Sequence, residues 1–134
     1  MLLPFLILLH GIDIVSNVYK YKLNHSMMVK IEKGKVFTVT SLVEYVEGGV
    51  VSKELIHNDV GSITLFSFDE GQGLSEHIAP YDAFIQVMEG EMELALEGVR
   101  SVVREGESFI IPSGARHAVY AVRKFKMLLT MIRG

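Results

Sequence analysis

The sequence contains no cysteine, and this absence excludes several kinds of site together. The chain has no disulfide, no thiolate nucleophile, and no zinc or iron–sulfur centre held by cysteine. A chain without cysteine is compatible with the reducing environment of the cytoplasm, and we expect the protein to be cytoplasmic.

The chain also lacks an excess of positive charge. It has 13 Lys and Arg residues against 16 Asp and Glu residues, which gives a formal net charge of -3. Because acidic and basic residues are interspersed, nothing attracts a phosphate backbone, and we expect no nucleic-acid partner. With 134 residues, 49% of them hydrophobic, the composition is typical of one globular domain with one core.

No apolar run is long enough to span a bilayer, which takes about 20 residues. The run from Met1 to Leu9 is closed by His10 and Asp13, with no basic residue before it and no small-residue cleavage site after it. We therefore expect no stable membrane anchor. We divide the chain into an N-terminal extension, residues 1–27, and a domain, residues 28–134.

Three interpretations of the extension stay open. It is an added apolar strand that packs on the domain or on a second subunit, a weak membrane or export segment, or the product of a start assigned too far upstream. The pair Met27-Met28 stands directly before Val29–Phe37, which has the composition of an ordinary domain opening. This arrangement favours the third interpretation.

No amphipathic helix of ten residues or more is apparent, and strand-sized segments alternate with turn signals instead. The Glu-Gly pairs at residues 89–90, 97–98 and 105–106 fall eight residues apart and are predicted to be turns. Short strands with turns about every 8 to 12 residues predict an all-β sandwich or barrel. The strand candidates include Val50–Ile56, Ser62–Phe68, Ala83–Met88, Met92–Leu96, Val99–Val103 and Phe125–Ile132.

Two stretches of the chain each place one histidine after a glycine: His77 in Gly71–Gly90, and His117 in Gly106–Ala121. Their spacing resembles the two motifs of the cupin superfamily. The matching residues are Gly71, His77 and Gly90 in the first motif, and Gly106, Pro112, Gly114 and His117 in the second. Where the family has a second histidine, a glutamate and an asparagine, this chain has Ala79, Ala83 and Ala121. The sequence thus resembles a small single-domain cupin with a degenerate first motif.

The resemblance to cupins implies a six-to-eight-stranded jelly-roll barrel of the RmlC-like kind, with a cavity at one mouth. It also implies a divalent metal inside the barrel, held in the family by the histidines and glutamate of the first motif and the histidine of the second. Of these metal ligands, this sequence keeps His77 and His117. We further expect a homodimer, as is usual in the family, because small barrels have edge strands to protect.

Residues two apart on a strand share a face, so alternation predicts which side chains join the histidines. The predicted ligand pocket has mostly small apolar walls and is open where Ala79 and Ala83 replace larger ligands, with Tyr81 at its rim and the inner residues Ala79, Ala83, Ile85 and Val119. Asp82 is a further candidate ligand, because two histidines and one carboxylate form the facial triad of non-haem iron oxygenases. Its other interpretation, which we prefer, is a corner residue whose carboxylate accepts hydrogen bonds from backbone N–H groups.

Two functions from different classes are consistent with this pattern. The first is a small-molecule-binding protein with a weak or incomplete site for Mn, Fe, Ni or Zn. A catalytic metal usually keeps three protein ligands, and two histidines fall one short of that number. The alternative is a metal-dependent enzyme of the dioxygenase or isomerase type that uses His77, His117 and a carboxylate. Fold alone does not choose between them, and it does not identify the ligand.

Overall fold

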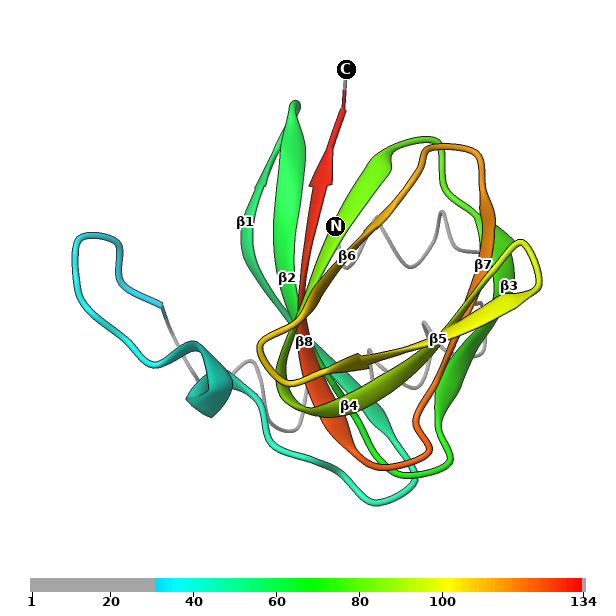
Figure 1. Ribbon diagram of the computed structural model, residues 1–134. Coiled ribbons are helices and arrows are strands. Elements are labelled where there is room, and N and C mark those ends of the chain that lie inside the picture. Colours follow the sequence, from blue (N-terminus) through cyan, green and yellow to red (C-terminus); the bar gives the residue numbers. More distant parts are fainter. Residues whose placement is uncertain (1–30, 134) are drawn as a thin grey trace.

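The computed structural model describes residues 31–133, which form eight β-strands and one short 3-10 helix, η2 (Val39–Leu42) (Figure 1). This architecture confirms the all-β prediction. The extension 1–27 lies outside the described residues. Within residues 31–133, no helix has the length and apolar character needed to cross a membrane. The strands are β1 (Val50–Asn58), β2 (Gly61–Phe68), β3 (Gly73–Ile78), β4 (Asp82–Leu96), β5 (Val99–Arg104), β6 (Ser108–Ile111), β7 (Arg116–Tyr120) and β8 (Phe125–Ile132).

The strands curl into a jelly-roll barrel whose two sheets share β4. The path of paired strands is β1-β2-β8-β4-β7-β3, and β5 and β6 both pair with β4. The beginning of β4 pairs with β6 and β8, and its end pairs with β5 and β7, always antiparallel. β4 therefore connects a first sheet (β1, β2, β8, β6 and the beginning of β4) to a second sheet (β3, β7, β5 and the end of β4), as Figure 1 shows.

The turn predicted at Glu89-Gly90 is wrong, because β4 runs through both residues. Gly90 has a φ of 73°, and the register between β4 and β8 shifts between Val87 and Glu89. A glycine often ends a strand, but Gly90 bends β4 instead. At this bend the chain passes from the first sheet into the second. The pairs at 97–98 and 105–106 do lie in turns, as predicted.

The inner faces of the two sheets enclose one apolar core. Alternate residues of β4, among them Ala83, Ile85 and Val87, are buried in it, as the sequence pattern predicts. Phe68 on β2 and Phe125 on β8 are fully buried cross-strand partners whose stacked rings have centroids 4.6 Å apart. Buried aromatic pairs of this kind contribute strongly to the stability of a small domain.

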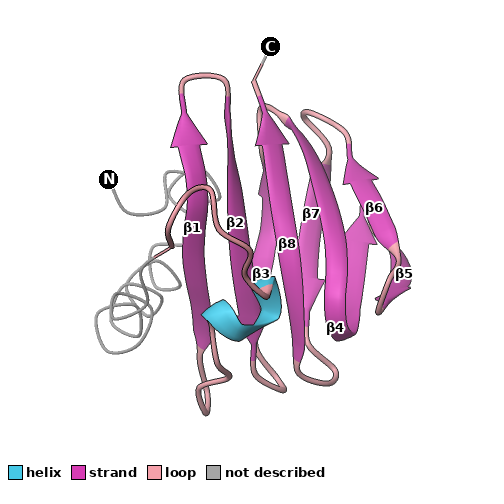
Figure 2. Ribbon diagram, turned by 90° about the vertical axis from the view of Figure 1, so that its left-hand side faces the viewer, coloured by secondary structure: helices cyan, strands magenta, loops and turns pink. Residues whose placement is uncertain are grey.

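A second apolar layer lies on the outer face of the first sheet. Residues 31–46, called the cover segment below, run across this face, and η2 lies over β2 in Figure 2. Leu42 and Val43 of the cover segment form one buried cluster with Val51 on β1 and Leu65 on β2. Both faces of the first sheet are therefore apolar where the cover segment crosses it.

Three hydrogen bonds among the described residues hold the cover segment to the sheet, and in one of them the Ser67 hydroxyl on β2 donates to the Glu44 carbonyl at 2.9 Å. The Lys126 ammonium, largely buried, donates to the Thr40 carbonyl at 2.7 Å. The Tyr45 hydroxyl donates to a Glu89 carboxylate oxygen at 2.6 Å. Burial, and then the adjacent Glu89 carboxylate, raise the pKa of Tyr45, so the hydroxyl remains the donor of this bond at every ordinary pH.

Candidate functional site

The two histidines identified by the motif spacing lie side by side inside the barrel. His77 on β3 and His117 on β7 are direct cross-strand partners. Their ring centroids are 4.1 Å apart, the ring planes meet at 66°, and both side chains are buried. The two imidazoles, 40 residues apart in sequence, therefore form one site.

A β-bulge in β3 sets this pairing. Leu74 on β3 lies opposite Val119 on β7, and His77 lies opposite His117. The step from the first pair to the second is three residues on β3 but only two residues on β7. A regular ladder would have put Glu76 opposite His117. The extra residue leaves Glu76 exposed and turns His77 inward. The bulge thus decides that the site holds a second imidazole and not a carboxylate.

Backbone carbonyls fix the tautomer of both rings. The Nδ1 of His77 lies 2.5 Å from the Ser75 carbonyl oxygen, and the Nδ1 of His117 lies 3.1 Å from that of Ala115. A carbonyl only accepts, so each Nδ1–H is the donor, and in the neutral ring Nε2 carries the lone pair. Burial lowers the pKa of His117, and its bond to Ala115 offsets part of this effect. His117 is therefore a neutral imidazole at pH 7.

The histidines border a small cavity of about 10 Å³, which is the space that one water molecule takes. Of the predicted pocket residues, Ala83, Ile85 and Val119 line it. The rest of its wall is apolar and comes from four other positions: Leu74, Ile111, Met127 and Leu129.

The other predicted site residues lie away from this cavity. Ala79 is buried in the same core cluster but is not part of the cavity wall. Tyr81 is half-buried, with the Arg133 guanidinium 5.4 Å from the centre of its ring. Asp82 opens β4 as an exposed residue, and its Oδ1 accepts a hydrogen bond of 2.9 Å from the backbone N–H of Ser113. The carboxylate of Asp82 thus has the corner role preferred above.

The site has fewer metal-binding side chains than a catalytic metal centre usually has. Among the described residues, no group of three or more His, Cys, Asp or Glu side chains could hold a metal ion. Catalytic sites usually supply three protein ligands and leave one position open, whereas this cavity has His77 and His117 alone. These two residues therefore do not fit a complete metal centre of the kind that cupins usually carry.

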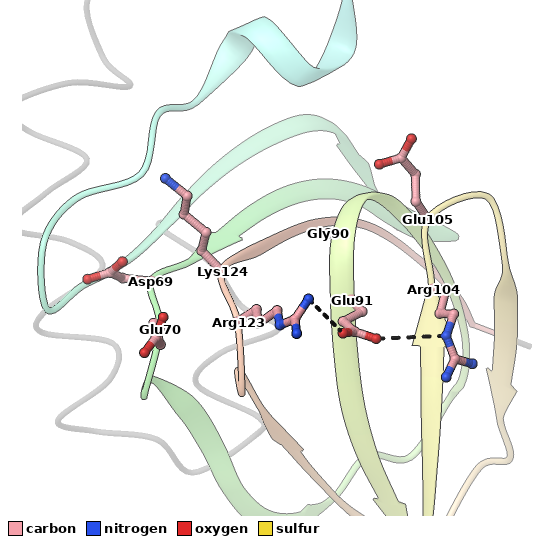
Figure 3. A pocket seen from close by; sticks show the side chains of 8 residues that line it. All are labelled: Asp69, Glu70, Gly90, Glu91, Arg104, Glu105, Arg123 and Lys124. Atoms are coloured by element: carbon pink, nitrogen blue, oxygen red, sulfur yellow. Dashed lines mark ion pairs between the residues drawn. The ribbon is translucent and has the colours of Figure 1, made fainter.

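A larger, charged groove lies at the opposite end of β3 and β7 (Figure 3). It has a volume of about 790 Å³. At its centre the Glu91 carboxylate lies 3.8 Å from Arg104 Nε and 3.8 Å from Arg123 Nη1. Its lining residues come from four separate parts of the chain: Asp69, Glu70, Gly90, Glu91, Arg104, Glu105, Arg123 and Lys124.

Sequence reasoning did not find this charged groove. In the sequence, Asp69 and Glu70 only follow the strand candidate Ser62–Phe68, and Glu105 belongs to a Glu-Gly pair that predicts a turn. Arg123 and Lys124 stand in a connection more than 50 residues from Asp69 and Glu70. Only the topology of the barrel joins these residues, so no local spacing signals the groove.

Comparison with known proteins agrees with the fold and the motifs. The family model described as "Cupin domain" matches residues 64–133. A conserved protein of unknown function from Streptococcus pyogenes is 33% identical, with a TM-score of 0.74, over 79% of this chain and 93% of that chain. A cupin 2 conserved barrel domain protein from Leptotrichia buccalis is 39% identical, with a TM-score of 0.71, over 72% of this chain and 47% of that chain.

An uncharacterized protein of Aquifex aeolicus is 28% identical over 106 residues, which cover 78% of this chain and 88% of the relative. The family match contains both histidines and seven of the eight strands, from the middle of β2 through β8. It spans more than half of the chain and coincides with the residues that build the barrel and its cavity. The chain therefore belongs to the cupin domain family, as a small member whose first motif lacks two of its usual ligands.

Proposed function

We propose that this cupin is a binding protein whose two histidines take one divalent cation weakly and reversibly. The observation that carries the proposal is the donor set: two adjacent imidazoles at a cavity whose described wall is otherwise apolar. Neutral imidazole suits Zn, Fe and Ni, and Mn is expected to bind least well. Two protein ligands leave the coordination shell incomplete, so the ion should be held weakly and exchange readily.

The size of the cavity supports binding over catalysis. A metal-dependent dioxygenase or isomerase needs room for an organic substrate beside the metal, and about 10 Å³ accepts only one water-sized occupant. The exposed Asp82 carboxylate is already engaged by the Ser113 N–H. Both observations favour an ion or a single small donor as the occupant of the site.

Calorimetric titration of untagged protein with Zn or Ni should give weak binding of one ion per chain that a chelator removes. His117→Ala should lower the affinity by more than about tenfold, because one imidazole alone does not chelate. His57→Ala on the exposed part of β1 serves as the control for surface histidines and should change nothing. Affinity should fall as the pH is lowered, because protons compete for the imidazoles.

A different result would favour the enzyme alternative. Tight stoichiometric binding that is lost in Asp82→Ala would establish a site of two histidines and one carboxylate. Unchanged weak binding in His117→Ala would instead show that the cation binds elsewhere on the chain. Either outcome would contradict the proposed two-histidine site.

The charged groove supports a second candidate, the binding of a small organic ligand. Its volume of about 790 Å³ falls in the range of ligand pockets, roughly 300–1,000 Å³. Arg104 and Arg123 share the single Glu91 carboxylate, so most of their N–H donors have no carboxylate partner among the described ion pairs. Asp69 and Glu70 add negative charge on the other side (Figure 3). The groove therefore suits a ligand with a carboxylate or phosphate and an amine.

Thermal unfolding in the presence of amino acids and dicarboxylates tests this candidate. A ligand at about 100 times its dissociation constant should stabilise the protein by about 2.7 kcal/mol. Arg104→Gln with Arg123→Gln should abolish that gain. Arg100→Gln, which changes an exposed arginine paired with Glu93 outside the groove, should preserve it. A gain that survives in the double variant would place the ligand elsewhere.

A further inference from the structure

The outer face of the second sheet carries a groove over two paired alanines. The strands β5, β4, β7 and β3 lie side by side in this sheet (Figure 1). Ala95 on β4 and Ala118 on β7 are direct cross-strand partners, and both line a groove of about 380 Å³, called the alanine groove below. Its border also includes Glu93, Arg100 and Tyr120, and it shares no lining residue with the charged groove.

Tyr120 gives the alanine groove an aromatic ring with an uncovered surface. The residue is 46% exposed, and among residues 31–133 no second ring and no cation lies against it. Its cross-strand partner on β3 is Gly73, which has no side chain to cover the ring. A Cβ built on Gly73 would lie 2.3 Å from the Val119 carbonyl oxygen, so the close approach of β7 requires glycine there. The ring of Tyr120 is therefore left open toward β3.

A charged pair borders the same groove and has unused hydrogen-bonding capacity. Glu93 Oε1 lies 3.6 Å from Arg100 Nη1, which is wider than a hydrogen bond. Within the described part of the chain, this ion pair is the one polar contact of either side chain. A hydroxyl group both donates and accepts, so a hydroxyl placed at the pair can donate to Glu93 and accept from Arg100. The two charges cancel, and the pair therefore selects no net charge in a ligand.

We propose that the alanine groove binds a neutral saccharide. A sugar ring has a C–H face and a rim of hydroxyl groups. The hydrogens of that face carry partial positive charge, because their carbons are bonded to oxygen, and the face of the Tyr120 ring is negative. The hydroxyl rim meets Glu93 and Arg100, and the short side chains of Ala95 and Ala118 let the sugar lie close to the sheet.

Two features of the alanine groove argue against other classes of ligand. A charged ligand gains little from a pair whose charges cancel, whereas an apolar ligand would cover Glu93 and Arg100 without giving them hydrogen bonds. The volume of about 380 Å³ lies at the lower end of the range of ligand pockets, roughly 300–1,000 Å³. The groove therefore suits a mono- or disaccharide, and this inference is independent of the histidine site and of the charged groove.

Amide NMR spectra of the isotope-labelled full-length protein test the site with methyl glucoside, maltose and cellobiose as probes. At least one of these sugars should shift the amide signals of Ala95, Ala118 and Tyr120 and saturate with a dissociation constant of about 1–10 mM, as expected for a small exposed contact. Glycerol at the same concentration is the control, because it has hydroxyl groups but no ring to stack on Tyr120.

Two variants remove the site in different ways. Tyr120→Ala should weaken sugar binding at least about tenfold, whereas Tyr120→Phe keeps the ring and should retain most of the affinity. Ala118→Leu should abolish binding by filling the groove, without removing any group that contacts the sugar. Phe37→Ala is the matched control, because Phe37 is a similarly exposed aromatic residue on the cover segment and should not affect sugar binding. Circular dichroism confirms that each variant is folded.

Three results would overturn the saccharide site. The first is the absence of a shift at Ala95, Ala118 and Tyr120 with every one of the three sugars. The second is an equal shift with glycerol, which would mean that the sugar ring makes no contact. The third is unchanged sugar binding in both Tyr120→Ala and Ala118→Leu, which would place the sugar elsewhere. The charged groove is tested with other residues and other ligands, so either site can fail alone.

Discussion

Replacing Ala83 by glutamate and Ala79 by histidine is expected to raise the affinity of the site for Zn or Ni by at least about a hundredfold. Ala83 lines the cavity together with both histidines, so a carboxylate at this position supplies the third protein ligand. Ala79 lies in the same core cluster outside the cavity wall. We therefore expect Ala83→Glu to account for most of the gain in metal affinity. Measuring the affinity of each single variant separates the two contributions.

The double variant should also become dependent on metal for its stability. A glutamate does not fit a cavity of about 10 Å³ among apolar side chains, and an unpaired buried carboxylate costs about 3 kcal/mol or more. Metal at about 1,000 times its dissociation constant restores about 4 kcal/mol. Thermal melts with zinc and with chelator should therefore differ widely for the variant and little for the wild type.

Ala118→Glu is the matched control for these melts. Ala118 lies next to His117 on β7 but belongs to the outer face of the second sheet, where it borders a groove with Glu93 and Arg100. A carboxylate there should give no dependence of stability on zinc. Equal, weak binding of metal by the wild type and the double variant would mean that position 83 does not reach the histidines, and the assignment of the cavity would be wrong.

The sequence predicted the two histidines and part of the cavity wall because both depend on local spacing. Glycine and proline positions identified the motifs around His77 and His117, and alternation predicted that Ala83, Ile85 and Val119 face inward. The alternation of inward and outward side chains fails at the bulge between Leu74 and His77. No residue type in β3 predicts this bulge.

The size of the cavity was not predictable in the same way. Its remaining wall comes from β3, β6 and β8, through Leu74, Ile111, Met127 and Leu129, and their meeting depends on how the barrel closes. Two alanines in place of larger ligands suggested an open pocket. The large neighbours fill that space almost completely, since close packing is the rule in protein interiors.

Gly90 marks the other limit of sequence reasoning. The three Glu-Gly pairs are indistinguishable in sequence, yet two lie in turns and the third lies inside β4. The difference comes from β8, whose backbone runs directly beside Gly90. A Cβ built on Gly90 would lie 2.3 Å from the Lys124 carbonyl oxygen, whereas one built on Gly98 would have no atom within 4 Å.

This difference predicts unequal effects from the same substitution at two glycines of similar conformation. Gly98→Ala, at a φ of 81°, should cost only the left-handed backbone strain of about 1–2 kcal/mol. Gly90→Ala, at a φ of 73°, carries that strain and must also displace the backbone at Lys124 and at Phe125, where β8 begins, so we expect a loss of at least about 4 kcal/mol.

Urea denaturation of the two alanine variants measures this difference directly. The β8 residue next to Lys124 is Phe125, which stacks on Phe68, so moving this backbone also loosens the aromatic pair in the core. The larger loss at Gly90 should therefore appear as a lower denaturation midpoint with an unchanged slope. Equal losses of stability at the two positions would show that β8 moves easily enough to accept the added methyl group. Gly90 would then be needed for its backbone angle alone.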